Sequence, residues 1–327
     1  MPLRSTITMI FLARSSLGWT PSQLRRPLST RLFSLAQNLV SVQECLGVEN
    51  DVIFVDGSCY HKGDRNGRQE FEQGPRLPEA RYMDMADLSC QKELFPDLNP
   101  KGLGYMLPPA ELFAMTMDEV GITNSDHVVV YGRDGSVFTP RTWFLFRAMG
   151  HERVSLMQGS LEDWQAAGGA VEEGSTIVST AADVLAKGDT PSYQAKEPVN
   201  VVTMKDMLQA MDEDVVIVDP RGSSFKKSGH IPGAIHVPYS TLVEKDNALK
   251  LKSRDKLLQI FANAGVDVNT DKKIIASCGS GVSVCHVLLA LEECGRDPAS
   301  QPTLMYDGSW AEWGSDPDTP KNLPEKK

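Results

Sequence analysis

Short apolar runs that end in an aspartate and a turn occur twice along the chain and predict buried strands. Val52–Asp56 and Val215–Asp219 each hold four apolar residues before the aspartate. Continuous runs of this kind are typical of strands buried on both faces of a parallel sheet. Segments with apolar residues three and four positions apart follow later strands and predict helices.

The order of these elements repeats once. In each half, a proline-containing turn leads into a second short strand. A third strand and a helix follow, and then a last strand with a tryptophan after it. The corresponding segments are 77–83 and 231–237, 128–131 and 274–277, and 156–160 and 305–309. The tryptophans, Trp164 and Trp313, are 149 residues apart. We interpret the pattern as a tandem duplication.

Strands that alternate with helices predict an α/β fold of two related domains, each a mostly parallel sheet flanked by helices. We predict that the domains span residues 39–168 and 200–318. Residues 169–199, rich in Gly, Ala, Ser and Thr, are predicted to link them, and residues 319–327 to form a polar tail. Ligands of such sheets bind at the carboxyl ends of the strands.

The first 43 residues differ in composition from the rest. They contain five arginines but no Asp, Glu or Lys. This composition is typical of an organellar import peptide, because the membrane potential attracts a positively charged helix. We predict that residues 1–38 are a cleaved transit peptide, with the mitochondrion as the expected compartment and the plastid as the alternative. A disordered tail is the other interpretation.

Charge, hydropathy and cysteine content argue against several classes of protein. Without those five arginines the formal net charge changes from -10 to -15, which disfavours a nucleic-acid partner. Apolar runs are short, so we expect no membrane association. Six cysteines without a Cys-x-x-Cys pair predict neither a disulfide scaffold nor a structural zinc site.

The two halves differ most in the turn after the third strand. The first half has Tyr131-Gly-Arg-Asp-Gly-Ser136 and the second has Cys278-Gly-Ser-Gly-Val-Ser283. Only the second contains a nucleophile, and its glycines allow backbone N–H groups to point inward. A helix predicted from about Val282 directs its positive end to the same place, so both features favour a thiolate.

A lone cysteine is more often a buried, inert thiol than a nucleophile. We expect that role for Cys285 and Cys294, which lie on the apolar helix that follows the turn. Cys278 instead lies where parallel α/β sheets place their chemistry. The position therefore favours Cys278 as the nucleophile.

Several motifs occur together in the two halves. The second contains Cys278-Gly-Ser-Gly-Val-Ser283, Gly229-His-Ile-Pro-Gly-Ala234, Asp219-Pro-Arg221 and Tyr306-Asp-Gly-Ser-Trp310-Ala-Glu-Trp313, and the first contains Pro140-Arg-Thr-Trp143 and Arg147-Ala-Met-Gly-His151. As a set they resemble the two-domain rhodanese family, over about residues 45–318. The resemblance implies tandem rhodanese-like domains, the first non-catalytic and the second catalytic.

The resemblance also implies thiosulfate or 3-mercaptopyruvate sulfurtransferase activity. Cys278 is expected to take a sulfane sulfur as a persulfide and to pass it to cyanide, a thiol such as glutathione, or reduced thioredoxin. The residues expected to bind the donor and the persulfide are those of the loop, Gly279, Ser280, Gly281, Val282 and Ser283. No metal or organic cofactor is expected.

The loop and its surroundings bear on the choice of donor. Members of the family that prefer 3-mercaptopyruvate carry Gly-Ser-Gly-Val after the cysteine, as here, whereas those that prefer thiosulfate carry basic residues. The basic insertion of mercaptopyruvate enzymes is shortened to residues 222–229. It leaves Arg221, Lys226 and Lys227 as candidate donor-binding cations, and Arg221 is equally expected to be a structural ion-pair partner.

The first half departs from the family at two positions. Arg76 replaces the histidine before the Ile-Pro turn, and Asn66 replaces an acidic residue upstream. The family's proton relay to the loop serine, here Ser280, is therefore not carried over. Arg76 becomes a candidate for binding an anionic donor across the domain interface.

Two other functions fit a cysteine in a backbone cradle. A tyrosine phosphatase requires an arginine six positions after the nucleophile, where this chain has Val284. The other is a non-enzymatic persulfide carrier or interaction module, which the intact loop disfavours. We expect His230 and His236 to have structural roles in the turn, and Trp310 and Trp313 to pack in the core.

Overall fold

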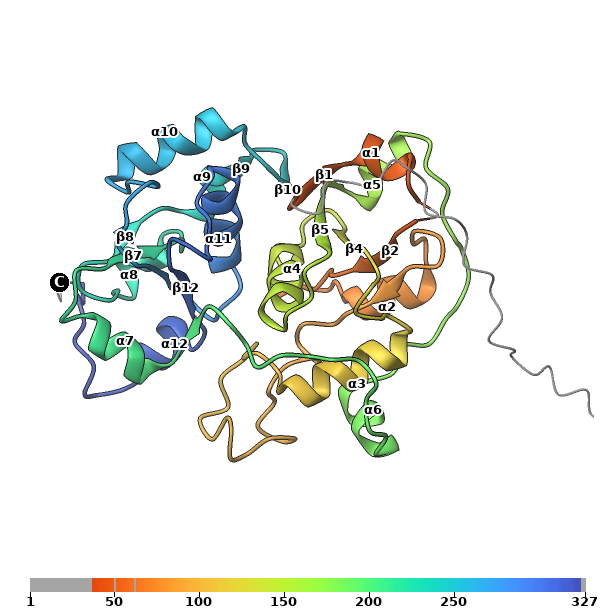
Figure 1. Cartoon of the computed structure of the whole chain (residues 1–327), viewed down its shortest axis with the longest axis horizontal. Coiled ribbons are helices and arrows are strands. Elements are labelled where there is room, and N and C mark those ends of the chain that lie inside the picture. Colours follow the sequence, from red (N-terminus) through yellow and green to blue (C-terminus); the bar gives the residue numbers. More distant parts are fainter. Residues whose placement is uncertain (1–36, 50, 62, 325–327) are drawn as a thin grey trace, which may run out of the picture. The chain divides into compact units, whose positions relative to one another are not determined.

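The computed structural model describes residues 37–49, 51–61 and 63–324 and contains two five-stranded parallel sheets (Figure 1). The strands of the first are β1 Leu39–Ser41, β2 Ile53–Asp56, β3 Arg81–Tyr82, β4 Val128–Gly132 and β5 Val154–Ser160, in the order β1-β5-β4-β2-β3. The strands of the second are β6 Val201–Val202, β7 Val216–Asp219, β8 Ile235–His236, β11 Ile274–Ala276 and β12 Thr303–Tyr306, in the order β6-β12-β11-β7-β8. The two orders are identical strand for strand, which confirms the predicted pair of related α/β domains.

Five of the described helices in each half occupy corresponding places between the strands. Those in the first part of the chain are α1 Val42–Leu46, α2 Gly67–Gln73, α3 Ala110–Val120, α4 Thr139–Ala148, α5 Leu161–Ala166 and α6 Ala181–Lys187. Those in the second are α7 Met204–Ala210, α8 Ser224–Lys227, α9 Tyr239–Leu242, α10 Arg254–Ala264, α11 Val284–Glu293 and α12 Ser309–Trp313. The corresponding helices are α1 to α5 in the first half and α7, α8, α10, α11 and α12 in the second, whereas α6 and α9 have no counterpart among the described residues. No helix of the described residues is long and apolar enough to span a bilayer.

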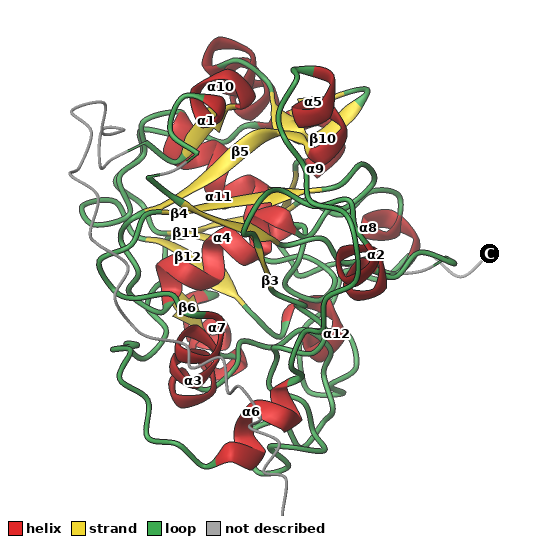
Figure 2. Ribbon diagram, turned by 90° about the vertical axis from the view of Figure 1, so that its right-hand side faces the viewer, coloured by secondary structure: helices red, strands yellow, loops and turns green. Residues whose placement is uncertain are grey.

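The strands are apolar throughout because both faces of each sheet are covered. On β4, Val128 and Val130 belong to the core beneath α4, whereas Val129 and Tyr131 face a second core with Trp164 of α5. Figure 2 shows the strands between layers of helices. Burying every side chain of a strand requires a continuous apolar run, which is the pattern that predicted these strands.

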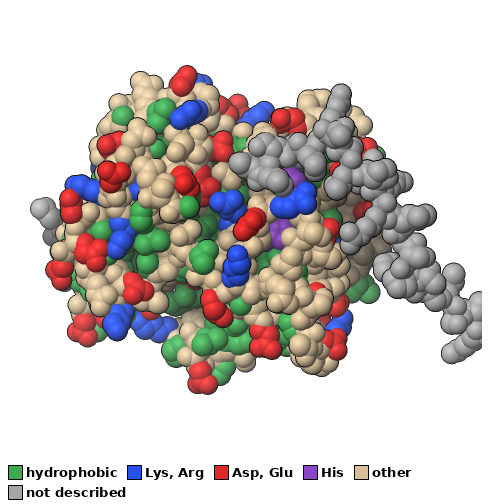
Figure 3. Space-filling model, viewed as in Figure 1, with side chains coloured by type: hydrophobic (Ala, Val, Ile, Leu, Met, Phe, Trp, Pro, Cys, Tyr) green, Lys and Arg blue, Asp and Glu red, His purple; other side chains and the backbone are tan. Residues whose placement is uncertain are grey.

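One core joins the two halves. It includes residues of α4 and of α11, and these two helices contact each other. The outer faces of the sheets have separate cores, one containing Trp164 and the other Trp313, both almost fully buried, as expected for Trp313. On the surface, Figure 3 shows basic and acidic side chains interspersed on the face it presents.

Some elements were not predicted from the sequence. The edge strands β1 and β6 have three and two residues, too few for a visible periodicity. A two-stranded antiparallel hairpin of β9 Val243–Glu244 and β10 Asn247–Leu251 was also missed. Leu249 of this hairpin lies against Gly132, 3.3 Å from the place of a Cβ atom there.

The segments predicted as linker and tail are more ordered than their composition suggested. Residues 169–199 contain α6, which begins with a capping box between Thr180 and Asp183 and contacts α3. The segment therefore runs along the first half. In the tail, Pro320 accepts a hydrogen bond from the Trp313 indole at 2.7 Å, and Asn322 pairs with His230 through the backbone. The predicted transit peptide falls outside the described residues, apart from Gln37 and Asn38.

Candidate active site

Cys278 lies in the loop between β11 and α11, at the carboxyl edge of the second sheet. Ser277 continues the strand by donating its N–H to Val218 O at 2.9 Å, and α11 begins six residues after Cys278. The thiol side chain is almost fully buried, with 1% of its surface exposed, whereas Gly279 and Ser280 are half-buried. The turn predicted to carry the nucleophile therefore leads directly into the N-terminus of α11.

The first residues of α12 hold Cys278 in place. Ser309 Oγ accepts the Cys278 N–H at 3.1 Å and lies 3.9 Å from Sγ. The Trp310 N–H binds Cys278 O at 3.0 Å, and the Ala311 N–H binds Gly279 O at 2.9 Å. Ser309 has a left-handed backbone with φ +52°, a strained conformation that is commonest at functional sites.

The loop presents unpaired hydrogen-bond donors. Within the described part of the chain, the backbone N–H groups of Gly279, Ser280, Gly281, Val282 and Ser283 have no acceptor. The positive end of α11 adds to them. Gly281, at φ +76°, makes the reversal that this arrangement requires. Such a loop is suited to hold an anionic sulfur.

The equivalent loop of the first half has no thiol and fewer unpaired donors. Gly132 stands where Cys278 stands, and Gly135 (φ +81°) corresponds to Gly281. The Arg133 N–H binds Ser58 Oγ at 2.9 Å, and the Asp134 N–H binds the Glu162 carboxylate at 3.1 Å. The Ser136 N–H binds Arg133 O at 3.1 Å, so three of the five corresponding N–H groups are already bound within the described residues.

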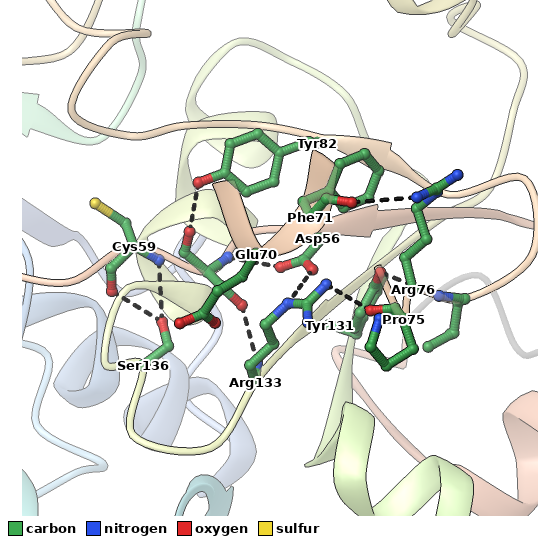
Figure 4. Close-up of polar contacts among 12 residues, drawn as sticks. Asp56, Cys59, Glu70, Phe71, Pro75, Arg76, Tyr82, Tyr131, Arg133 and Ser136 are labelled. Atoms are coloured by element: carbon green, nitrogen blue, oxygen red, sulfur yellow. Dashed lines mark hydrogen bonds and ion pairs between the residues drawn. The ribbon is translucent and has the colours of Figure 1, made fainter. Parts of the chain in front are cut away.

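A buried ion pair fills the space beside the first-half loop. The Arg133 guanidinium binds Asp56 Oδ2 at 3.0 Å and Pro75 O at 2.8 Å, as Figure 4 shows. Asp56 is fully buried, so this pairing is essential to offset its charge. The second half has an equivalent buried pair, Asp219 with Arg221, so the two sites differ in the thiol rather than in this ion pair.

The structure gives Arg221 an ion-pair role. Its guanidinium binds both carboxylate oxygens of Asp219, the shorter contact being 2.7 Å, and donates to Gly229 O at 2.9 Å. It also stacks 4.9 Å from the Trp310 ring, and its Cδ lies 3.9 Å from the place of a Cβ at Gly279. Arg221 thus packs against the loop, and Asp219 neutralises its charge.

The other predicted cations are not gathered at Cys278. Arg76 binds Phe71 O, Gly174 O and Glu172, at 3.3, 2.9 and 3.5 Å, and these contacts tie α2 to the segment after α5. Lys226 and Lys227 are exposed on α8, and their ammonium groups form no hydrogen bond or ion pair with the described residues. Arg76 is therefore occupied within the first half, and the two lysines are free surface charges.

The two histidines of the second half support the same turn. Phe225 stacks between His230 and His236, with ring centroids 3.9 and 4.3 Å away. His236 Nε2 contacts Arg221 O at 2.5 Å. These contacts agree with the structural role expected for the pair.

Cys285 of α11 and Cys294, directly after this helix, are core residues, as expected. Burial raises the pKa of Cys285 to about 12 and that of Cys294 to about 11, so both are protonated near neutral pH. Cys285 Sγ lies 3.6 Å from Gly281 O and packs beneath the loop.

Sequence reasoning missed the residues that join the loop to the first half. They are Arg141 and Asp307, which form a buried ion pair of 2.8 Å, together with Ser309. All three lie in motifs noted in the sequence, Pro140–Trp143 and Tyr306–Trp313. Nothing in the sequence shows that the two motifs meet, because they come from different halves.

Comparison with known proteins identifies the family. The rhodanese-like domain model matches residues 64–167 and 203–316. A 3-mercaptopyruvate sulfurtransferase of Escherichia coli is 35% identical over 269 residues, 79% of this chain and 86% of that protein. The Arabidopsis thaliana protein named thiosulfate/3-mercaptopyruvate sulfurtransferase 1, mitochondrial, is 31% identical over 335 residues, 94% of this chain and 84% of that one.

A solved structure gives the same result. The crystal structure of SseA from Escherichia coli, described as a 3-mercaptopyruvate sulfotransferase, superposes with a TM-score of 0.69 at 31% identity. The superposition covers 84% of this chain and 99% of that one. With two matching domains, this topology and these relatives, the chain belongs to the rhodanese family.

Proposed function

We propose that this protein is a sulfurtransferase that carries sulfur as a persulfide on Cys278. The observation that carries the proposal is a thiol at the start of a loop directly before α11, with five N–H groups that have no acceptor among the described residues. The relatives named 3-mercaptopyruvate sulfurtransferase support the reaction class. The equivalent loop of the first half has glycine in place of the thiol.

The reaction has two transfers. The Cys278 thiolate attacks the donor sulfur and forms an S–S bond. The C–S bond of 3-mercaptopyruvate breaks, and its carbon takes a proton to give pyruvate; with thiosulfate the S–S bond breaks and sulfite leaves. A nucleophilic acceptor then attacks the outer sulfur, and the electrons of that bond return to Cys278 as thiolate.

The loop accounts for how charge is stabilised in both transfers. Negative charge starts on Sγ, moves to the outer sulfur of the persulfide and returns. Fixed N–H donors stabilise such charge without reorganising. Because these N–H groups belong to the backbone, they are present whichever sulfur donor binds.

We further propose 3-mercaptopyruvate as the preferred donor, on the basis of the Gly279–Val282 sequence. The wild-type protein should then show a higher kcat/KM for 3-mercaptopyruvate than for thiosulfate. Lys226 and Lys227 do not contact Cys278, but their unpaired surface charges would attract an anionic donor, so changing both to Met should raise its KM a few-fold with kcat unchanged. Steady-state kinetics with both donors measure this.

A matched control comes from the same half. Lys272 and Lys273 are paired with Asp214 and Glu213 at 2.7 Å, and changing both to Met removes the same charge elsewhere. An equal rise of KM in the control would show that the loss of net charge, rather than of Lys226 and Lys227 in particular, weakens donor binding. A preference of the wild type for thiosulfate would contradict the proposed donor.

As acceptor we propose a small thiol such as glutathione, or reduced thioredoxin, with the mitochondrion as the compartment. The mitochondrial name of the Arabidopsis relative and the acid-free, arginine-containing start of the sequence support this location. Residues 1–38 fused to a fluorescent protein should direct it to mitochondria. Accumulation in plastids, or in the cytosol, would contradict the assignment.

A further inference from the structure

We propose that Arg141, which belongs to the half without the nucleophile, is a positioning residue for sulfur transfer at Cys278. This inference rests on the proposed function. Arg141 lies on α4, and its side chain is 2% exposed. Its Nη2 atom donates to Asp307 Oδ1 at 2.8 Å and to Tyr105 O at 2.6 Å, and Nη1 lies 3.1 Å from Met305 Sδ.

Asp307 links the first half to the residues that hold Cys278. Its second carboxylate oxygen accepts the Leu107 N–H at 2.7 Å, so two groups of the first half bind one carboxylate of the second. Two residues further on is Ser309, whose Oγ accepts the Cys278 N–H at 3.1 Å. A displacement of Asp307 would therefore be passed directly to the nucleophile.

The same ion pair supports the loop from below. A Cβ atom at Gly281 would lie 2.9 Å from Asp307 Oδ1 and 3.4 Å from Arg141 Nη1. The guanidinium and the carboxylate thus form the surface on which the Gly281 reversal rests. Tyr105 presents its carbonyl to Arg141 from a left-handed backbone, φ +62°, which a non-glycine residue adopts only when its surroundings require it.

Stability alone does not explain such a pair. A buried ion pair is often no more stabilising than apolar residues of the same volume, because both charges lose their hydration. Breaking it has a local consequence here. Without Arg141, the Asp307 carboxylate would remain unpaired beside the loop that has to hold a thiolate and a persulfide anion, and like charges repel.

The test compares Arg141→Met and Arg141→Lys with Arg147→Met. Arg147 is also on α4 and also pairs with the other half, at 3.5 Å from Glu292, but this contact is away from the loop and partly exposed. Each variant is assayed for kcat and KM, for the single-turnover rate of Cys278 persulfide formation, and for thermal unfolding. Activity is measured well below the unfolding temperature of each variant.

We expect Arg141→Met to lower kcat and the single-turnover rate at least tenfold with little change in KM, and Arg141→Lys to recover part of the loss. Arg147→Met should retain kcat within about twofold. Adding Asp307→Asn to Arg141→Met should restore part of the rate, because it removes the unpaired carboxylate. If Arg141→Met does not fold, the rates of Arg141→Lys and Asp307→Asn are compared with that of Arg147→Met instead.

Two results would overturn the inference. One is a single-turnover rate in both Arg141 variants that equals the wild-type rate, and the other is an equal loss in Arg147→Met. The Cys278→Ala variant, run alongside, keeps this separate from the proposed function. If it is inactive while the Arg141 variants are fully active, only the positioning role fails; if it is active, the proposed function itself fails.

Discussion

Replacing Cys278 by Ala is expected to abolish sulfur transfer from every donor. The change removes the sulfur atom on which the persulfide forms, and the free N–H groups of the loop remain with nothing to stabilise. Loss of a catalytic nucleophile lowers turnover by at least about four orders of magnitude in enzymes of comparable design. The measurement is kcat/KM for 3-mercaptopyruvate and thiosulfate, with mass spectrometry of the donor-treated protein for one added sulfur.

Cys285→Ala is the matched control for this prediction. Cys285 lies seven residues further along the chain, is fully buried, and has a thiol whose raised pKa keeps it protonated. Its removal should leave the added sulfur and the activity in place, with a small loss of stability. Turnover that survives in Cys278→Ala, or an added sulfur that disappears only in Cys285→Ala, would assign the chemistry to a different residue.

Gly281→Ala is expected to lower kcat/KM by about a hundredfold or more, because loss of one hydrogen-bond donor to a reacting anion lowers kcat by about 10²–10³-fold. Any L-residue is strained at φ +76° by roughly 1–2 kcal/mol. The added Cβ would also lie 2.9 Å from Asp307 Oδ1 and 3.2 Å from Asp307 O, so the loop has to move. Kinetics with 3-mercaptopyruvate and denaturant unfolding measure the two effects.

Gly135→Ala separates the loss of activity from the loss of stability. Gly135 has nearly the same backbone conformation, φ +81°, and the nearest atom to its added Cβ is Arg65 Nη1 at 3.5 Å, on a flexible side chain. It should lose a similar roughly 1–2 kcal/mol of stability and keep full activity. Equal activity losses in the two variants would show that the loop around Cys278 has no special part in the reaction.

Much of the site could be predicted from the sequence because it depends on short-range sequence patterns that determine strands, turns and helices. The apolar run before Cys278 predicts a buried strand, the glycines after it predict a reversal, and the apolar spacing beyond predicts α11. Each of these elements is determined by interactions between residues that are close together in the chain. The loop residues 279–283 stand in the structure where this reasoning put them.

The charged residues could not be placed in the same way. Arg221 had two interpretations in the sequence, and only the structure shows its guanidinium on Asp219. Arg76 was expected to reach an anionic donor, but its contacts are with Phe71, Glu172 and Gly174. A long side chain has many rotamers of similar energy, so its partner is decided by which buried acceptors lie within reach.

The sequence by itself determined the two related parallel sheets and the turn that carries Cys278. These follow from hydrophobic periodicity, from glycine positions and from the internal repeat, all of which are properties of short segments. Only the tertiary structure decided that the first half takes part in the second half's site, through Arg141, Leu107 and Asp307. These contacts join residues 166 and 200 positions apart. No local rule predicts them, because they exist only once the shared core of α4 and α11 has brought the two halves together.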